Sequence, residues 1–438
     1  MNFSKGINNL LKAITIFSQV CYTFLIYKCG LTSFEDSVIS VCESFIHKNY
    51  ILTKVIQWGI QEIYEDGNIN DNDKLKNYFS TFSNKIPYSH DELLYSNVLI
   101  KNAIQYASAH NDELVVENET QDENNGSYYI PINSGSVALV YKGRLNDAHV
   151  VIKILRPNIR NKIKEDLDVL LNIFDNIVIK KLISYYLKIN FKTFITSNVD
   201  VLLNQCDFKC ELQNGVLFKN NFKNKKNIVI PTFYTQFTDN FEDMIIMEYL
   251  DGPIAKNVPL DKIHKYSEDI QSFSLETIFR YKTLHGDFHL GNIIIMNDGK
   301  SIGIIDFGIT YSLKNELSDK LFDIVFLSFK IKDVKILNQI LKNIIRLICS
   351  NENQHKTIFN IMKEDEKLIN RMRCSNFSAN LLIKLINKIM SLENIEIDSD
   401  LCRLLLSTMS SLQTIEYVNN NISLEKMMRL YMSKCVKM

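Results

Sequence analysis

Several common sequence features are absent from this chain of 438 residues. No Cys-x-x-Cys pair occurs, and the nine cysteines are scattered and odd in number. This argues against a disulfide framework or a zinc site and indicates reduced thiols in an intracellular protein. Net charge is also absent, because fifty Lys and Arg balance fifty Asp and Glu. We therefore do not expect a nucleic-acid-binding protein held mainly by counterion release.

A long apolar run is missing too. The one candidate, residues 13–27, is interrupted by Ser18 and Gln19 and falls short of the ~20 residues that a transmembrane helix needs. Lys5 and Lys12 precede it, as in a signal peptide, but no small-residue cleavage site follows. The stretch favours a buried helix or a helix on a membrane surface over a true anchor.

Proline and glycine disappear towards the end of the chain. The last proline is Pro259 and the last glycine is Gly308, and apolar residues then recur three and four positions apart. This pattern predicts an all-helical C-terminal end. Residues 1–110 carry long amphipathic stretches with few turn signals and predict further helices.

Short β-branched runs lie between these helical regions. Turn residues separate the runs, which predicts consecutive antiparallel strands. The predicted strands are residues 127–132, 136–143, 149–155, 227–234 and 244–250, with a helical stretch over 159–222 and a strand-rich interruption over 285–312. The sequence predicts an α+β fold with four parts. These are a helical extension (1–116), an acidic linker or exposed loop (117–126), a small lobe with the sheet (127–250) and a helical lobe (251–438).

The strongest chemical signal runs from His285 to Asn292 and is followed by two predicted strands and Asp306-Phe307-Gly308. Phosphoryl transfer needs a carboxylate at the acceptor hydroxyl, and an amide and a second carboxylate on a divalent cation. Asp287, Asn292 and Asp306 have the spacing for these three roles. Each residue alone would be interpreted as the cap of a turn, but the whole set in register favours catalysis.

A kinase-like site also needs a lysine in the third strand, where its charge holds the α- and β-phosphates. Lys153 lies in such an apolar strand. The simpler interpretation is an edge or snorkelling lysine, which the downstream motif disfavours. Glu211, on a predicted helix, is the expected acidic partner of Lys153.

Two backbone segments are candidates for direct contact with a nucleotide. The loop between the first two strands is rich in small residues, so its N–H groups could approach a phosphate. The end of the strand over 244–247 makes a natural hinge whose backbone could bind adenine. The nucleotide-binding candidates are Ser134, Gly135, Ser136, Val137, Lys153, Glu211, Glu248 and Leu250.

Together these residues resemble the UbiB-type atypical kinases of the AarF/UbiB family, from about residue 45 to about residue 345. The further elements that carry the resemblance are Arg156-Pro157, Asp166-Leu167, Asp207 with Glu211 and Asn214, Met247-Glu248-Tyr249 with Asp251-Gly252, and His285 and His289 of the catalytic motif. Upstream, Lys54-Val55-Ile56-Gln57 is similar to the family's KxGQ element.

The resemblance implies a bilobal protein-kinase-like fold with ATP and Mg²⁺ as cofactors. In this family the KxGQ helices, here with Lys54 and Gln57, fold over the site where a protein substrate would lie. It therefore implies an ATPase or small-molecule kinase connected with quinone or lipid metabolism, and no Ala-Pro-Glu follows Gly308. The expected partners are a nucleotide and a lipid or membrane surface, without nucleic acid; a homodimer is compatible with these features.

Four positions depart from the family pattern. Ile56 replaces the KxGQ glycine, Gly135 lies in a loop usually rich in alanine, Gln205 replaces an acid, and Leu139 replaces a glutamine. An aminoglycoside- or choline-type phosphotransferase is an alternative, because His-Gly-Asp with an Asn five residues later also occurs there. A nucleotide-binding pseudokinase that acts as a scaffold is a third.

Overall fold

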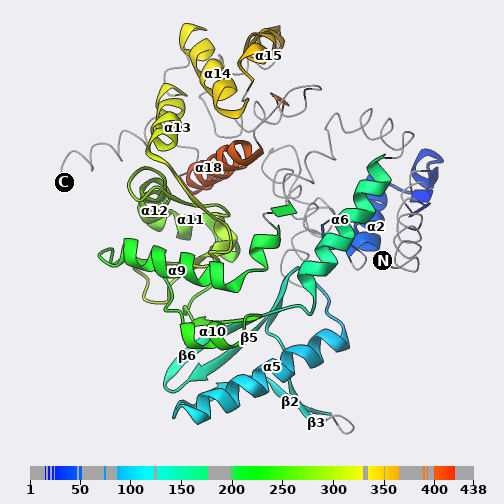
Figure 1. Ribbon diagram of the computed structural model, residues 1–438, viewed down its shortest axis with the longest axis vertical. Helices are drawn as coiled ribbons and strands as arrows, with labels where there is room; N and C mark the ends of the chain where they lie inside the picture. The colour runs from blue at the N-terminus through cyan, green and yellow to red at the C-terminus, as the bar shows by residue number, and fades with distance from the viewer. Residues whose placement is uncertain are drawn as a thin grey trace. The chain divides into compact units, whose positions relative to one another are not determined.

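The computed structural model describes residues 25–46, 49–51, 86–122, 126–175, 202–328, 334–349, 351–364 and 399–419, with a few single positions between them. Figure 1 labels the helices and strands along the chain. The chain divides into two compact units. The first consists of Met1–Leu212 and Phe233–Tyr249, and the second of Gln213–Thr232 and Leu250–Met438. The fold is α+β and kinase-like, as predicted.

An antiparallel sheet of five strands forms the centre of the first unit. Its order is β1-β5-β6-β8, and β4 pairs with β5. The strands are β1 (Leu114–Val116), β4 (Asn133–Ser134), β5 (Ala138–Leu145), β6 (Ala148–Leu155) and β8 (Met244–Glu248). Asn146 and Asp147 connect β5 to β6, and Asn146 has a φ of 52°, a left-handed conformation that tight hairpin turns require. The predicted β5–β6 hairpin is therefore confirmed.

The helix α5 (His90–Ala109) packs on one face of this sheet. Ile100, Ala103 and Ala107 of α5 share an apolar core with the alternate residues of β6, such as Val150 and Ile152. Since successive side chains of a strand point to opposite faces, Lys153 lies on the face away from this core. α5 begins with a capping box, in which Ser89 and Glu92 each bind the other's backbone N–H.

The segment 117–126 is not the linker that we predicted. It contains β2 (Glu119–Asp122), which pairs with β3 (Gly126–Tyr129) in a separate hairpin. Backbone hydrogen bonds form this ladder whatever the charge of the side chains, so acidic composition alone was misleading. β1 likewise lies within the predicted helical extension.

Two further helices of the first unit are α2 (Phe34–Ile46) and α6 (Ile159–Asp175). The short α10 (Thr235–Asn240) precedes β8. Of the helices that the structure describes, none is both long and apolar enough to cross a bilayer.

The second unit contains two small sheets. β10 (Ile293–Ile295) and β11 (Ile302–Ile304) form a hairpin, and β9 (Thr283–His285) pairs with β12 (Thr310–Ser312). The strand that we predicted over 227–234 is divided between the units. β7 (Ile228–Val229) pairs in parallel with β11 of the second unit, whereas Phe233 forms an isolated bridge with Met247 of β8 in the first.

Helices make up the rest of the second unit. The longer ones are α12 (Ser267–Phe279), α13 (Asn315–Ser328), α14 (Val334–Ile348), α15 (Glu352–Glu364) and α18 (Ser399–Val418). Short helical turns occur at η1 (Ala255–Asn257), α11 (Leu260–Ile263), η2 (His264–Tyr266) and η3 (Leu290–Asn292). The apolar residues of α12 to α18 form one buried cluster. The prediction of a helical end is confirmed for the described residues.

Candidate active site

Lys153 and Glu211 form an ion pair in the first unit. The distance from Lys153 Nζ to Glu211 Oε1 is 2.7 Å, and the two side chains are 16% and 4% exposed. Lys153 comes from β6, and Glu211 from the first turn of α9 (Phe208–Phe222). A lysine held in this way presents a fixed positive charge, which is what a phosphate-binding lysine needs.

Asp207 fixes the start of α9. Its Oδ1 accepts a hydrogen bond from the Cys210 backbone N–H at 3.1 Å, the arrangement of an N-terminal helix cap. Asp207 thus sets where α9 begins and, with it, the position of Glu211. We assigned Asp207 only by resemblance, because the sequence predicted one helical stretch over 159–222 and not a new helix that begins at Phe208.

The loop before β5 is a tight turn. The Gly135 N–H donates to the Ala138 carbonyl at 2.9 Å, and the Arg156 N–H donates to the Val137 carbonyl at 2.9 Å. The Ser134 hydroxyl donates to the Ile86 carbonyl, so its proton is engaged within this unit. The Ser134 backbone is engaged too, because its N–H donates to Asn133 Oδ1 at 2.8 Å and its carbonyl accepts from the Ile86 N–H at 2.9 Å. Ser136 is itself buried.

The predicted hinge begins at Glu248, the last residue of β8. The Tyr249 N–H is occupied by a 2.9 Å hydrogen bond to the His149 carbonyl. This N–H is therefore engaged within the first unit. Leu250, the first hinge residue of the second unit, is buried.

The segment from His285 to Asn292 in the second unit is held by its own side chains. The Asn292 Nδ2 donates to the Asp287 carbonyl at 2.9 Å, and the His289 Nδ1 accepts from the Gly291 N–H at 3.0 Å. Since Nδ1 of His289 accepts, its Nε2 carries the proton in the neutral ring. That Nε2 lies 3.4 Å from Asp287 Oδ1 and 3.5 Å from Asn292 Nδ2, so the side chains of Asp287, His289 and Asn292 contact one another.

The β10–β11 hairpin places Asn292 and Asp306 at one end. Ile293 pairs with Ile304, and the Ile305 N–H donates to the Asn292 carbonyl at 3.0 Å. Asp306 follows with a φ of 65°, a left-handed conformation that Asp tolerates better than most residues and that often occurs at functional sites.

His285 lies beneath this motif and is buried. Its Nδ1 accepts from the Asp287 N–H at 3.3 Å, and its Nε2 lies 3.3 Å from the Ile305 carbonyl. Burial lowers the pKa of His285 below its usual 6.5, against the opposing effects of Asp287 and Asp306. The neutral ring with its proton on Nε2 satisfies both contacts. His285 therefore has a structural role.

Asn292 and Asp306 suit a magnesium ion. Because the Asn292 nitrogen is engaged with Asp287, its amide oxygen is the atom that would face a cation, and Mg²⁺ prefers such hard oxygen ligands. The described residues contain no group of three or more His, Cys, Asp or Glu that could hold a metal. An ion held by one carboxylate, one amide and the phosphates of a nucleotide needs no such group.

The predicted site residues thus fall into two sets. Lys153, Glu211 and the loop around Gly135 lie in the first unit, and Asp287, Asn292 and Asp306 lie in the second. Lys54 and Gln57 lie outside the described residues. Asn214, which we named only by resemblance, donates to the Phe307 carbonyl at 2.9 Å within the second unit.

Comparison with known proteins identifies the family of this chain. The family model for the ABC1 atypical kinase-like domain matches residues 101–341, more than half of the chain. The chloroplastic protein ACTIVITY OF BC1 COMPLEX KINASE 8 of Arabidopsis thaliana is 28% identical over 202 residues, 44% of this chain and 26% of that protein. The "Probable protein kinase UbiB" of Shewanella halifaxensis is 28% identical over 222 residues, 48% of this chain and 39% of that protein.

The chain spans less than half the length of these two curated relatives. Among solved structures, the complex of Rv3197 with erythromycin from Mycobacterium tuberculosis matches 68% of this chain and 77% of its own, with a TM-score of 0.38 and 15% identity. The extent of the family match decides the classification. This chain belongs to the family of ABC1 atypical kinase-like domains.

Proposed function

We propose that this protein is an ATP- and Mg²⁺-dependent atypical kinase or ATPase of the UbiB type. The observation that carries the proposal is the Lys153–Glu211 ion pair in one unit together with the Asp287, Asn292 and Asp306 set in the other. These are the groups that phosphoryl transfer requires. Membership of the ABC1 family favours this activity over an aminoglycoside- or choline-type phosphotransferase.

Each residue has a distinct task in this proposal. Lys153, fixed by Glu211, binds the α- and β-phosphates, and Asn292 and Asp306 would hold Mg²⁺. When bound, the ion neutralises charge on the β- and γ-phosphates. Asp287, whose carboxylate contacts His289 Nε2, accepts the proton of the acceptor hydroxyl or water.

The acceptor that we propose is a small molecule, or a lipid- or quinone-linked group, rather than a protein. The KxGQ-like residues Lys54 and Gln57 and the absence of an Ala-Pro-Glu sequence after Gly308 support this choice. To reach a lipid-linked acceptor, the protein would also have to bind a membrane surface. Residues 13–27 are the candidate segment for that binding.

Calorimetry tests the nucleotide site. Asp306→Asn keeps the shape of the side chain and tolerates the left-handed backbone, but removes the charge that would bind Mg²⁺. We expect wild-type protein to bind ATP only with Mg²⁺ and the variant to bind at least about tenfold more weakly. The matched control is Asp298→Asn, in the turn of the same hairpin, which should bind as wild type. Equal metal-free binding by wild type and Asp306→Asn would contradict the proposal.

Turnover tests the chemistry separately. Phosphate release from ATP on liposomes should fall by at least about 100-fold in Asp287→Ala, because general-base catalysis contributes about that much. If wild type and Asp287→Ala release phosphate equally while both bind ATP with Mg²⁺, the protein is a nucleotide-binding scaffold and not an enzyme.

A further inference from the structure

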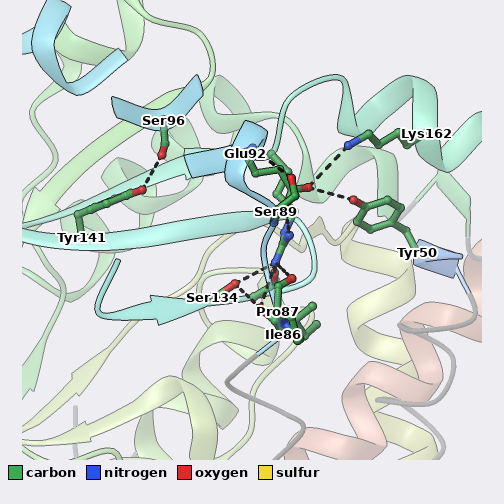
Figure 2. A network of polar contacts seen from close by, with 11 residues as sticks. Tyr50, Ile86, Pro87, Ser89, Glu92, Ser96, Ser134, Tyr141 and Lys162 are labelled. Carbon is green, nitrogen blue, oxygen red and sulfur yellow. Dashed lines mark hydrogen bonds and ion pairs between the residues drawn. The ribbon is translucent and has the colours of Figure 1, made fainter. Parts of the chain in front are cut away.

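A buried arginine lies directly behind the loop that we propose for the phosphates. Arg156 is 3% exposed, and its guanidinium donates to the Gly135 carbonyl through Nε at 3.1 Å and Nη2 at 3.0 Å. Nη2 also donates to the Ser134 hydroxyl at 2.9 Å. Figure 2 shows this cluster of polar contacts, in which Ser134 lies near Ile86 and Pro87.

Holding the Gly135 carbonyl also fixes the next N–H group. The Gly135 C=O and the Ser136 N–H belong to one planar trans peptide and point in opposite directions. Because the carbonyl is bound to Arg156, the Ser136 N–H is directed away from the guanidinium. Within the described residues this N–H makes no hydrogen bond to another backbone group, so the backbone leaves its donor capacity unused.

Glu92 of α5 holds Arg156 from the other side. Arg156 Nη1 donates to Glu92 Oε2 at 2.5 Å, and the two side chains are only 2% and 6% exposed. Lys162 of α6 lies 3.6 Å from Glu92 Oε1 but is 38% exposed (Figure 2). A buried carboxylate is costly without a partner, so Glu92 and Arg156 fix each other's positions.

Glu92 also binds the N-terminal segment. The Tyr50 hydroxyl lies 3.2 Å from Glu92 Oε1, and burial, reinforced by Glu92, raises the pKa of Tyr50 to about 12. The hydroxyl is therefore protonated and donates. The Tyr50 N–H also donates to Asp166 Oδ2 of α6 at 2.6 Å, and Ile51 is buried. The segment Asn49–Ile51 is thus docked on α5 and α6 within the first unit, shortly before the KxGQ-like residues.

We propose that Arg156 is a positioning residue that aims the Ser136 N–H at a phosphate of the bound nucleotide, and that Glu92 couples this loop to the docked segment Asn49–Ile51. The proposal rests on the proposed function for its ligand. Coupling is reciprocal, so docking of the segment strengthens nucleotide binding by the same factor as nucleotide strengthens docking.

Hydrogen exchange of the full-length chain without nucleotide tests the loop. Arg156→Lys keeps the charge next to Glu92 but loses the planar fork that reaches the Gly135 carbonyl. We expect amide exchange over residues 132–138 to become about tenfold faster. The matched control is Lys162→Gln, which removes the other cation at Glu92 and should leave this exchange unchanged. Equal exchange in Arg156→Lys and wild type would overturn the proposal. It would show that Arg156 serves only as a positive charge next to Glu92 and does not fix the loop.

Nucleotide affinity tests the role of the loop. We expect Arg156→Lys to weaken binding of ATP with Mg²⁺ about tenfold without changing its dependence on Mg²⁺, and Lys162→Gln to bind as wild type. If amide exchange in the loop becomes faster in Arg156→Lys but the affinity for ATP with Mg²⁺ does not fall, the positioning role is overturned. If wild-type protein binds no ATP, the proposed function fails, whereas the exchange data still decide whether Arg156 fixes the loop.

The coupling has its own measurement. Saturating ATP with Mg²⁺ should slow exchange of the Tyr50 amide in wild type, and Tyr50→Phe, which removes only the hydroxyl, should reduce that effect. An unchanged exchange rate of the Tyr50 amide in wild type would overturn the coupling.

A second variant tests the loop in case Arg156→Lys fails to fold. Ser134→Ala removes a single partner of Arg156 and should make exchange over residues 132–138 faster, to a smaller extent. Unchanged exchange would count against the proposal.

Discussion

Adjacent residues of β6 point to opposite faces of the sheet, one to the apolar core and the other to the Lys153–Glu211 ion pair. Ile152 and Ile154 are fully buried, whereas Lys153 points to the other face and meets Glu211. Glu211 is the more buried partner, with a side chain that is 4% exposed. Loss of Lys153 therefore leaves a carboxylate that is expensive to keep charged.

We predict that Lys153→Met lowers the free energy of unfolding by about 3 kcal/mol, because removal of one partner of a buried pair leaves the other charge uncompensated. Thermal and urea unfolding measure the loss. The double variant Lys153→Met with Glu211→Gln should recover most of it. The control is Lys142→Met, whose partner Glu117 lies 3.6 Å away on a more exposed surface, with an expected loss below about 1 kcal/mol. Equal losses in both single variants would contradict this prediction.

His285 predicts a pH dependence of stability. Its pKa in the folded protein lies below 6.5, so below that pH the unfolded chain binds a proton that the folded chain excludes. Stability is then fully present above about pH 6.5 and decreases on acidification, by at most about 1.4 kcal/mol per pH unit from this group. Asp287 and Asp306 oppose this shift, and His289 adds to it.

The measurement is the free energy of unfolding of wild type and of His285→Gln from pH 7.5 to 5.5, in metal-free buffer. It shows whether stability decreases on acidification, as predicted. The variant is less stable at neutral pH but should lose less stability on acidification, because glutamine does not titrate. His149→Gln, at an exposed position of β6, should retain the full wild-type slope. A wild-type slope in His285→Gln would show that other groups cause the acid sensitivity.

At the scale of elements, Gly143 in strand β5 and Gly135 in the loop between β4 and β5 differ in whether a side chain would fit. A Cβ at Gly143 in β5 would overlap the Val115 carbonyl oxygen of the adjacent strand β1, whereas a Cβ at Gly135 meets only the Ala138 carbonyl oxygen, at 3.6 Å. Gly143 is therefore required for strand pairing, and Gly135 is not required for folding.

We predict that Gly143→Ala lowers the free energy of unfolding by roughly 1–3 kcal/mol, because the overlap forces the strands apart. Gly135→Ala should leave it unchanged or raise it by up to about 1 kcal/mol. The same Gly135→Ala protein should bind ATP with altered affinity, since the added methyl group lies in the loop proposed for the phosphates. Thermal unfolding and calorimetry on the two variants check both statements; a destabilised Gly135→Ala would contradict them.

The elements that could be predicted from the sequence are those set by local pattern. The β5–β6 hairpin and the helices after Ser312 follow from alternation, from turn residues and from missing Gly and Pro. The pairing of β7 with β11 could not be predicted, because a strand of two residues gains its place only from a distant partner. The roles of Glu92 and Arg156 were missed for the same reason, although Ser89 and Glu92 have the spacing of a capping box.

At the scale of the whole molecule, the two sets of site residues lie in different units of the chain. The proposal that both sets bind one nucleotide makes a clear prediction. A non-hydrolysable ATP analogue with Mg²⁺ should slow hydrogen exchange both over residues 133–155 and over residues 285–308. At 100 times the dissociation constant it should also stabilise the protein by about 2.7 kcal/mol. Protection confined to one of these regions would contradict a shared nucleotide.

The His285 ring also bridges two stretches of backbone. One of its nitrogens contacts the Asp287 N–H and the other the Ile305 carbonyl, so the imidazole lies between the chain at Asp287 and the chain just before Asp306. Phe218, Phe273, Phe288 and Phe307 surround it. A rigid five-membered ring therefore separates the two stretches that carry these carboxylates. We expect substitutions among the surrounding apolar side chains to change the stability of the unit more than they change this separation.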